Sequence, residues 1–332
     1  MLGLLNRRTA AAVRSPASAM LGLLGRRTAA AAARGPRRPG LSTDAAAATA
    51  AENARAIAER GAELELEFVQ FSFVDLFGVQ RSKLVPASRV AEIAEGGAGF
   101  AGFAAHLDMD PTMGDLLALP DPSTLVALPW RPAVGWLSCD LVHEGAALAH
   151  GPRNVLRRVQ AELAAVHGLT LKTGVECEFF LLDGGGGAPG GVAAPSDALD
   201  TQGKPCYDAH ALMRRFELIA ALVRHMEVLG WGPYQADHED ANGQFEINWD
   251  YADALVTADR VVFFKYMTRT LAERAGFRAT CACALARVST ASGGYDGHSR
   301  EPCPRGRQVV VMGALDRETA ILESPVGVVG KW

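Results

Sequence analysis

The chain has 332 residues, of which 49% are hydrophobic and 21% are charged, and its formal net charge is −4. This length suits about two domains. No apolar run approaches the roughly 20 residues of a membrane-spanning helix, and the six cysteines are too scattered to form a disulfide framework. The composition therefore predicts a globular protein without a membrane partner.

The N-terminal segment differs in charge from the rest of the chain. Residues 1–43 contain eight arginines and no Asp, Glu or Lys, and the run Met-Leu-Gly-Leu-Leu at Met1 returns at Met20. Such a segment is typical of a transit peptide, so we expect a disordered leader that directs the protein to a mitochondrion or plastid. The alternative is a low-complexity tail without a targeting role. The remaining chain is acidic, which argues against nucleic acid as a partner and suits cation binding.

The next region has the pattern of short strands. Alternating apolar residues over 63–85 predict strands with a turn at Gly78. The pieces stay short up to Leu148, because prolines interrupt them repeatedly. This pattern predicts a small β-rich first domain.

From Gly151 onward, strands alternate with helices. Pro152 opens a helix that ends at Gly168. The further predicted elements are a strand at about 173–182, a helix at about 207–229, strands at about 232–236 and 244–249, and a helix at about 252–275. This order indicates an α/β or α+β region. The glycine-rich run at 184–191 lacks the spacing of a phosphate-binding loop and predicts a surface loop.

Two glutamates occupy one face of the strand near residue 175. Glu176 and Glu178 are two residues apart, so they point the same way about 6.6 Å apart. Their neighbours are apolar, so the two like charges repel each other and also lose hydration. Either a bound cation offsets this cost, or the strand face is solvated.

A second acidic pair flanks a predicted turn at Asn242-Gly243. Glu239 precedes this turn and Glu246 follows it, on a strand in which apolar and polar residues alternate. A hairpin would bring the pair together, and a neighbouring strand could add Glu176 and Glu178. Four carboxylates on one sheet face predict a site for Mg²⁺ or Mn²⁺, which prefer oxygen ligands.

Other polar residues nearby have less specific signals. Asp237 and Asp240 are interpreted as turn residues, because Asp favours turns for local reasons; the alternative is that they are cation ligands. His238 is a ligand, a substrate contact or a structural histidine. Asp108 and Asp110 are assigned to a loop.

The two acidic motifs together resemble a known family. Glu-x-Glu-Phe-Phe at Glu176, followed by His-Glu-x-x-x-Gly-Gln-x-Glu at His238, resembles the glutamine synthetase superfamily, and most of all its type III and γ-glutamylmethylamide synthetase branch. The resemblance covers about residues 62–280. It implies an α+β fold, with a β-grasp domain over 62–148 and the first part of a catalytic domain, built on a curved antiparallel sheet, over 151–280. It also implies a ring-shaped homo-oligomer.

The resemblance also implies roles for individual residues. Glu178, Glu239 and Glu246 would bind a first divalent metal and Glu176 a second, while Glu178, Glu239 and His238 would contact substrate. In such enzymes the γ-carboxylate of glutamate attacks the γ-phosphate of ATP, and ammonia or methylamine then displaces phosphate from γ-glutamyl phosphate. We therefore expect an ATP-dependent carbon–nitrogen ligase of nitrogen metabolism, with Mg²⁺ or Mn²⁺ as cofactor.

The resemblance ends near Thr280. The Gly-x-Gly-x-His-x-His strand that usually follows in the family does not appear, and residues 281–332 predict a disordered tail foreign to the family. The cysteines at 281, 283 and 303 with His298 have the wrong spacing for zinc. We expect this chain to be an incomplete ligase that is inactive by itself. The alternative is a non-catalytic structural or interaction protein.

Overall fold

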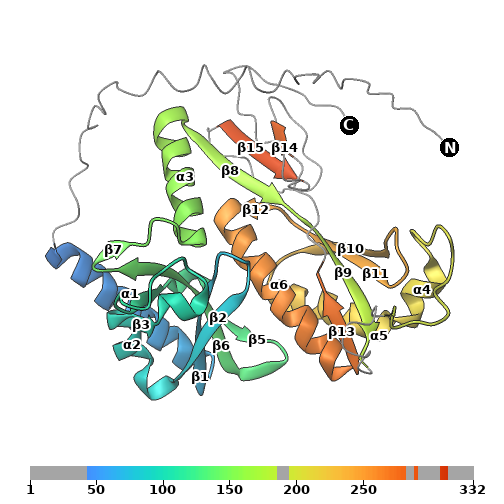
Figure 1. The fold of residues 1–332 in the computed structure, drawn as a ribbon, viewed down its shortest axis with the longest axis horizontal. Coiled ribbons are helices and arrows are strands. Elements are labelled where there is room, and N and C mark those ends of the chain that lie inside the picture. The colour runs from blue at the N-terminus through green and yellow to red at the C-terminus, as the bar shows by residue number, and fades with distance from the viewer. Residues whose placement is uncertain (1–42, 185–193, 282–287, 291–306, 313–332) are drawn as a thin grey trace, which may run out of the picture. The chain divides into compact units, whose positions relative to one another are not determined.

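The computed structural model describes residues 43–184, 194–281, 288–290 and 307–312 (Figure 1). The expectations for the leader, for most of the glycine-rich run and for most of the tail fall outside these residues. The described chain combines helices with three β-sheets, so the predicted α+β class is confirmed. None of its helices has the length and apolar character needed to cross a bilayer.

Six α-helices and three short 3-10 helices occur in the described residues. The α-helices are α1 (Thr43–Glu63), α2 (Val90–Gly96), α3 (Pro152–His167), α4 (Ala209–Arg214), α5 (Phe216–Val228) and α6 (Ala254–Arg274). The 3-10 helices are η2 (Ala87–Arg89), η3 (Gly102–Ala105) and η4 (Pro122–Thr124). Helix α3 has the predicted ends, because Pro152 fits the first turn and Gly168 adopts a φ of 63° after the last one.

The first sheet has the strand order β2-β1-β6-β4-β3, and β5 and β7 also pair with β6. Its strands are β1 (Phe68–Val74), β2 (Gln80–Pro86), β3 (Ala98–Phe100), β4 (Leu116–Pro120), β5 (Val126–Leu128), β6 (Arg131–His143) and β7 (Ala146–Ala147). Strands β1 and β6 are parallel and the other pairs are antiparallel. Side chains of this sheet, such as Phe71 and Leu137, share one apolar core with Ile57 of α1 and Ala94 of α2.

The second sheet is antiparallel throughout, with the order β10-β11-β9-β13. Its strands are β9 (Glu176–Asp183), β10 (Pro233–His238), β11 (Gln244–Trp249) and β13 (Phe277–Thr280). Helices α5 and α6 lie beside it (Figure 1) and bury one face, where Leu222 and Phe264 pack with Phe179 and Ile247. The opposite face carries the acidic residues considered below.

The third sheet has the order β12-β8-β15-β14, with β15 parallel to β8. Its strands are β8 (Leu169–Gly174), β12 (Ala252–Asp253), β14 (Val288–Thr290) and β15 (Arg307–Met312). Two short segments of the tail for which the sequence predicts disorder therefore form strands.

The first predicted strand begins five residues later than expected. Residues 63–67 alternate in polarity, but Glu63 still belongs to α1. The helix ends with two paired hydrogen bonds, from the Leu66 amide to the Gly61 carbonyl (2.9 Å) and from the Glu65 amide to the Ala62 carbonyl (3.1 Å). Glu65 takes a φ of 53° at this helix end, so β1 starts only at Phe68.

Two other predicted elements are divided in the structure. The strand expected at 173–182 is two strands that meet at Val175, because β8 pairs in the third sheet and β9 in the second. The helix expected at 207–229 is interrupted at Arg215, whose φ of −112° and ψ of 13° leave the helical region. Arg215 instead directs its guanidinium to the carbonyl and hydroxyl of Ser196.

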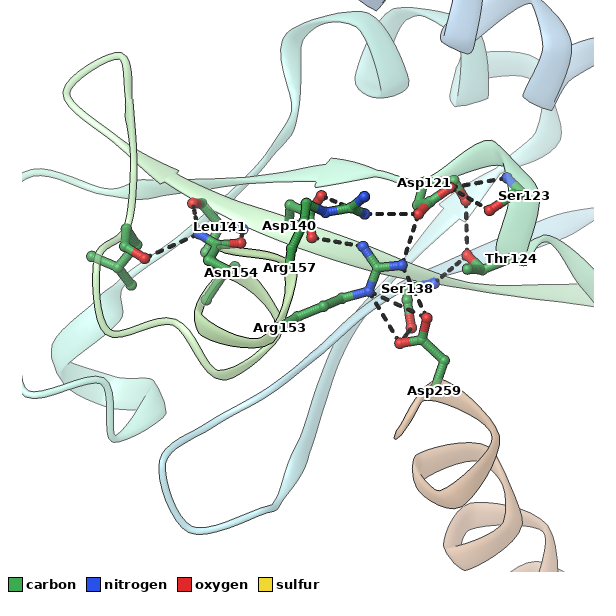
Figure 2. A network of polar contacts seen from close by, with 11 residues as sticks. Asp121, Ser123, Thr124, Ser138, Asp140, Leu141, Arg153, Asn154, Arg157 and Asp259 are labelled. Atoms are coloured by element: carbon green, nitrogen blue, oxygen red, sulfur yellow. Dashed lines mark hydrogen bonds and ion pairs between the residues drawn. The ribbon is translucent and has the colours of Figure 1, made fainter. Parts of the chain in front are cut away.

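A largely buried arginine joins the first sheet to two helices (Figure 2). Arg153 of α3 donates to Asp140 of β6 (2.6 Å), to Asp121 beside η4 (2.7 Å) and to Asp259 of α6 (2.9 Å). Burial alone would raise the pKa of Asp121, but hydrogen bonds from Ser123 and Arg153 and the charge of Arg153 lower it to about 2. Arg153 therefore contacts all three carboxylates, two of which also pair with Arg157, and it fixes where α6 lies against the first sheet.

We predict that replacing this arginine strongly destabilises the fold. Arg153→Met leaves Asp259 without its ion-pair partner and leaves Asp121 and Asp140 with only the more exposed Arg157, which costs about 3–5 kcal/mol of unfolding free energy. Arg157→Met is the matched control, because Arg157 contacts the same Asp121 and Asp140 but its side chain is 47% exposed. The control should lose less than about 1 kcal/mol. Urea titration followed by circular dichroism measures both, and equal losses would contradict the assignment.

Candidate metal centre

Strand β11 separates apolar from polar side chains between the two faces of the second sheet. Phe245, Ile247 and Trp249 are buried in the core beneath α5 and α6. Glu246 and Asn248 alternate with them and point to the opposite face, as the sequence predicts. That face is still largely shielded from solvent, since Glu246 is only 8% exposed.

The strand register aligns further acidic residues with Glu246. Glu178 of β9 is its direct partner on one side and Asp237 of β10 on the other, while Glu176 pairs with Asn248. Directly paired residues in antiparallel strands share a face, with Cβ atoms about 5 Å apart. Three of the four predicted ligands, Glu176, Glu178 and Glu246, therefore lie on one face.

Glu239 lies where β10 gives way to the turn toward β11. Its backbone amide donates to the Gln244 carbonyl (3.0 Å), and its carboxylate accepts from the Asp240 amide (3.0 Å). Glu239, Cys206 and Asp240 each have a potential ligand atom, and these three atoms lie within 4.8 Å of one another. No sequence motif indicated this group. Among the described residues, the four predicted glutamates do not form so tight a group, and they would need to change rotamers to share one ion.

His238 belongs to the opposite face of the sheet. The ring is fully buried against Phe245, and its Nε2 pairs with Asp200 at 2.8 Å while Nδ1 lies 2.9 Å from the Glu239 carbonyl oxygen. Both ring nitrogens are engaged within the protein. Of the three roles left open by the sequence, this geometry favours the structural one, and a substrate contact stays a prediction.

The sequence interpretation of Asp237 is wrong, whereas that of Asp240 holds. Asp237 belongs to β10 and pairs with Glu246, because the turn begins only after His238. Asp240 lies in the turn and is exposed. Asp108 and Asp110 lie in the loop between η3 and β4, as predicted.

The sequence analysis also missed two residues that support the site. Gln244 donates to the Glu178 carboxylate (2.5 Å), and buried Asp200 holds the turn by accepting from Asn242 and from the Gly243 amide. Gln244 lies two residues before Glu246, so strand alternation could have placed it on the acidic face. Asp200 had no signal, because a loop distant in sequence carries it.

The acidic face is poorly compensated. Burial raises the pKa of Glu246 to about 7; a hydrogen bond from Asn248 opposes this rise, and Glu176, Glu239 and Asp237 add to it. Burial also raises the pKa of Glu178; the hydrogen bond from Gln244 opposes this rise, and repulsion from Glu239 and Glu176 adds to it. Each raised pKa means that the folded protein disfavours the ionised form of that carboxyl group.

The residues present fit a hard divalent cation. The ion pairs of the described residues include none to Glu176, Glu178, Glu239 or Glu246, so no arginine or lysine neutralises them there. Oδ1 of Asp237 and Oδ1 of Asn248 are buried without a hydrogen-bond partner. Buried acceptors without donors are costly, and a set of oxygen donors suits Mg²⁺ or Mn²⁺.

The fold and the site thus define an α+β protein with a carboxylate-lined antiparallel sheet. Residues 149–295 match the family model of the glutamine synthetase catalytic domain. The chain is 51% identical over 218 residues to a glutamine synthetase of Rhizobium meliloti, a match to 66% of this chain and 48% of that protein. It is 38% identical over 216 residues to a glutamate–methylamine ligase of Methyloversatilis universalis, covering 64% and 48%.

Two solved structures are also similar to this chain. A GmaS–ADP complex superposes with a TM-score of 0.64 at 58% identity, covering 68% of this chain and 50% of that one. Ligand-free GmaS gives the same TM-score and identity. The predicted resemblance to the glutamine synthetase family is confirmed, since residues 149–295 match the model of its catalytic domain. The chain spans about half the length of the curated relatives it matches.

We predict that neutralising Glu246 removes a pH-dependent loss of stability. Because the folded-state pKa is raised from 4.5 to about 7, the folded form holds the proton more tightly than the unfolded chain. Unfolding free energy therefore falls as pH rises from about 4.5 to 7 and is lowest above that range. Without divalent cations, Glu246→Gln should be about 2–3 kcal/mol more stable than wild type at pH 8, with little difference at pH 4.5.

Urea unfolding in chelator at the two pH values measures this difference. Glu92→Gln is the control, because Glu92 lies on α2 with its side chain 61% exposed. A Glu246 variant with the wild-type pH dependence would contradict the raised pKa.

Proposed function

We propose that the chain carries the metal-binding sheet of an ATP-dependent ligase that joins ammonia or methylamine to the γ-carboxylate of glutamate. The observation that carries this proposal is the pairing of Glu178 with Glu246, beside Glu176, on a sheet face whose reverse side is core. The names of the relatives support it, since they include a glutamine synthetase and a glutamate–methylamine ligase. The similarity to GmaS solved in complex with ADP supports a nucleotide as ligand.

The proposed ligands follow the family motifs. Glu178, Glu239 and Glu246 hold the first cation, and Glu176 contributes to the second. Such cations offset the negative charge of the reacting carboxylate and phosphate groups. Gln244 and Asn248 orient Glu178 and Glu246 through their hydrogen bonds. The core beneath β11 fixes the position of the backbone. Cation binding therefore requires only a change of side-chain rotamers.

The assembly around this sheet is part of the same proposal. We assign residues 62–148 to the β-grasp domain and 151–280 to the catalytic domain, in a ring-shaped homo-oligomer whose substrates are glutamate, ATP and ammonia or methylamine. The leader at 1–43 would direct the protein to a mitochondrion or plastid. The comparisons do not favour a purely structural role, because the relatives named are enzymes.

We predict that the glutamates bind Mn²⁺ directly. Glu178→Ala should abolish Mn²⁺ binding to the 332-residue protein, because it removes a ligand and leaves Glu246 without its cross-strand partner. Glu92→Ala, a change at an exposed glutamate of α2, should keep wild-type affinity. Free Mn²⁺ measured by electron paramagnetic resonance gives both dissociation constants. Equal affinities in the two variants would argue against the site.

The ligase reaction itself can be tested with a fusion. We expect the 332-residue chain alone to form no detectable γ-glutamyl hydroxamate from glutamate, hydroxylamine and ATP. Residues 43–280, joined to the part of the Rhizobium meliloti relative that lies beyond the matched region, should form it in the presence of Mg²⁺. The same fusion with Glu178→Ala should not. A fusion that binds Mn²⁺ but yields no product would contradict the proposed reaction, and product from the unfused chain would contradict its inactivity.

A further inference from the structure

The acidic face extends one strand beyond the glutamates that the family motifs indicate. Asp237, Glu246 and Glu178 are direct neighbours across β10, β11 and β9, so three carboxylates form one row perpendicular to the strands. Their Cβ atoms are about 5 Å from one to the next. A row of like charges at this spacing is unfavourable unless a positive charge lies against it.

The orientation of Asp237 follows independently from its neighbours on β10. Ala236 packs with the apolar core, and His238 is fully buried against Phe245 on that same side. Since successive residues of a strand point to opposite faces, Asp237 must point to the acidic face. The side chain is therefore directed toward the glutamates by two well-packed residues that flank it.

The Asp237 carboxylate has an acceptor for which the protein supplies no donor. Its Oδ1 is buried without a hydrogen-bond partner, and no ion pair of the described residues includes this carboxylate. A second unpartnered acceptor occurs on the same face: Asn248 is 3% exposed, gives its amide N–H to Glu246 and leaves its own Oδ1 unpaired. One of these oxygens lies across the strand pair from Glu246 and the other two residues along β11, and buried oxygens without donors are expected around a cation.

We propose that Asp237 is a further carboxylate of the cation site, which shares with Glu246 the charge of the bound divalent ion. This inference rests on the proposed function, because it assumes that the glutamates bind a cation. It adds a residue from β10, a strand that carries none of the four motif glutamates. It also gives Asp237 two measurable effects: it weakens the cation-free fold and strengthens cation binding.

The isosteric change Asp237→Asn separates these effects from a structural role. It retains the shape of the side chain and removes its charge. We expect the cation-free variant to melt at a higher temperature than wild type, and its dissociation constant for Mn²⁺ to be about 10-fold higher. Asp115→Asn is the matched control, because Asp115 is an exposed aspartate beside β4 of the first sheet. It should change neither quantity.

Both quantities are measured on the 332-residue protein, by thermal melts in chelator and by Mn²⁺ titration monitored by electron paramagnetic resonance. Wild-type affinity in Asp237→Asn, together with loss of binding in Glu178→Ala, would overturn the inference and leave the proposed function standing. Absence of Mn²⁺ binding to the wild-type protein would overturn both. A lower melting temperature for Asp237→Asn would show that the carboxylate stabilises the hairpin, which also contradicts the inference.

Discussion

The pairing of β9, β10 and β11 is the constraint from which the site follows. Core residues such as Phe245 and Ile247 fix one face of β11 against α5 and α6, and strand geometry then forces Glu246 to the other face. The register adds Glu178 and Asp237 on either side of it. The hydrophobic effect that buries one face therefore also concentrates negative charge on the other.

The chain deals with clustered carboxylates in two opposite ways. Around Arg153, three aspartates share one internal guanidinium, and the pKa of Asp121 falls to about 2 despite its burial. On the acidic face the described residues provide no such cation, and the pKa of Glu246 rises to about 7. Clustered carboxylates thus stabilise the fold where an arginine of the chain pairs with them. On the acidic face they require a positive charge from outside the chain. This contrast is the physical basis for assigning a metal to the sheet.

Much of the architecture was predictable because local signals agreed with tertiary packing. Pro152 and Gly168 mark the ends of α3 by their own backbone preferences, and alternation along β11 placed Glu246 and Asn248 correctly. Two element boundaries that the sequence predicted wrongly have different causes. Glu65 ends α1 in a left-handed conformation where alternation suggested a strand, and Arg215 interrupts a helix in order to reach Ser196, which is distant in sequence.

The sequence by itself determined the two acidic motifs, because these depend on residue types at fixed spacing, and their resemblance to a known family implied the α+β class. Only the tertiary structure decided that Asp237 belongs to the acidic face and that His238 does not, because that depends on where the turn begins and on the register between strands. It alone also showed Asp200 holding the turn and Arg153 joining the first sheet to α6. Those contacts link residues far apart in the chain, and no local pattern encodes them.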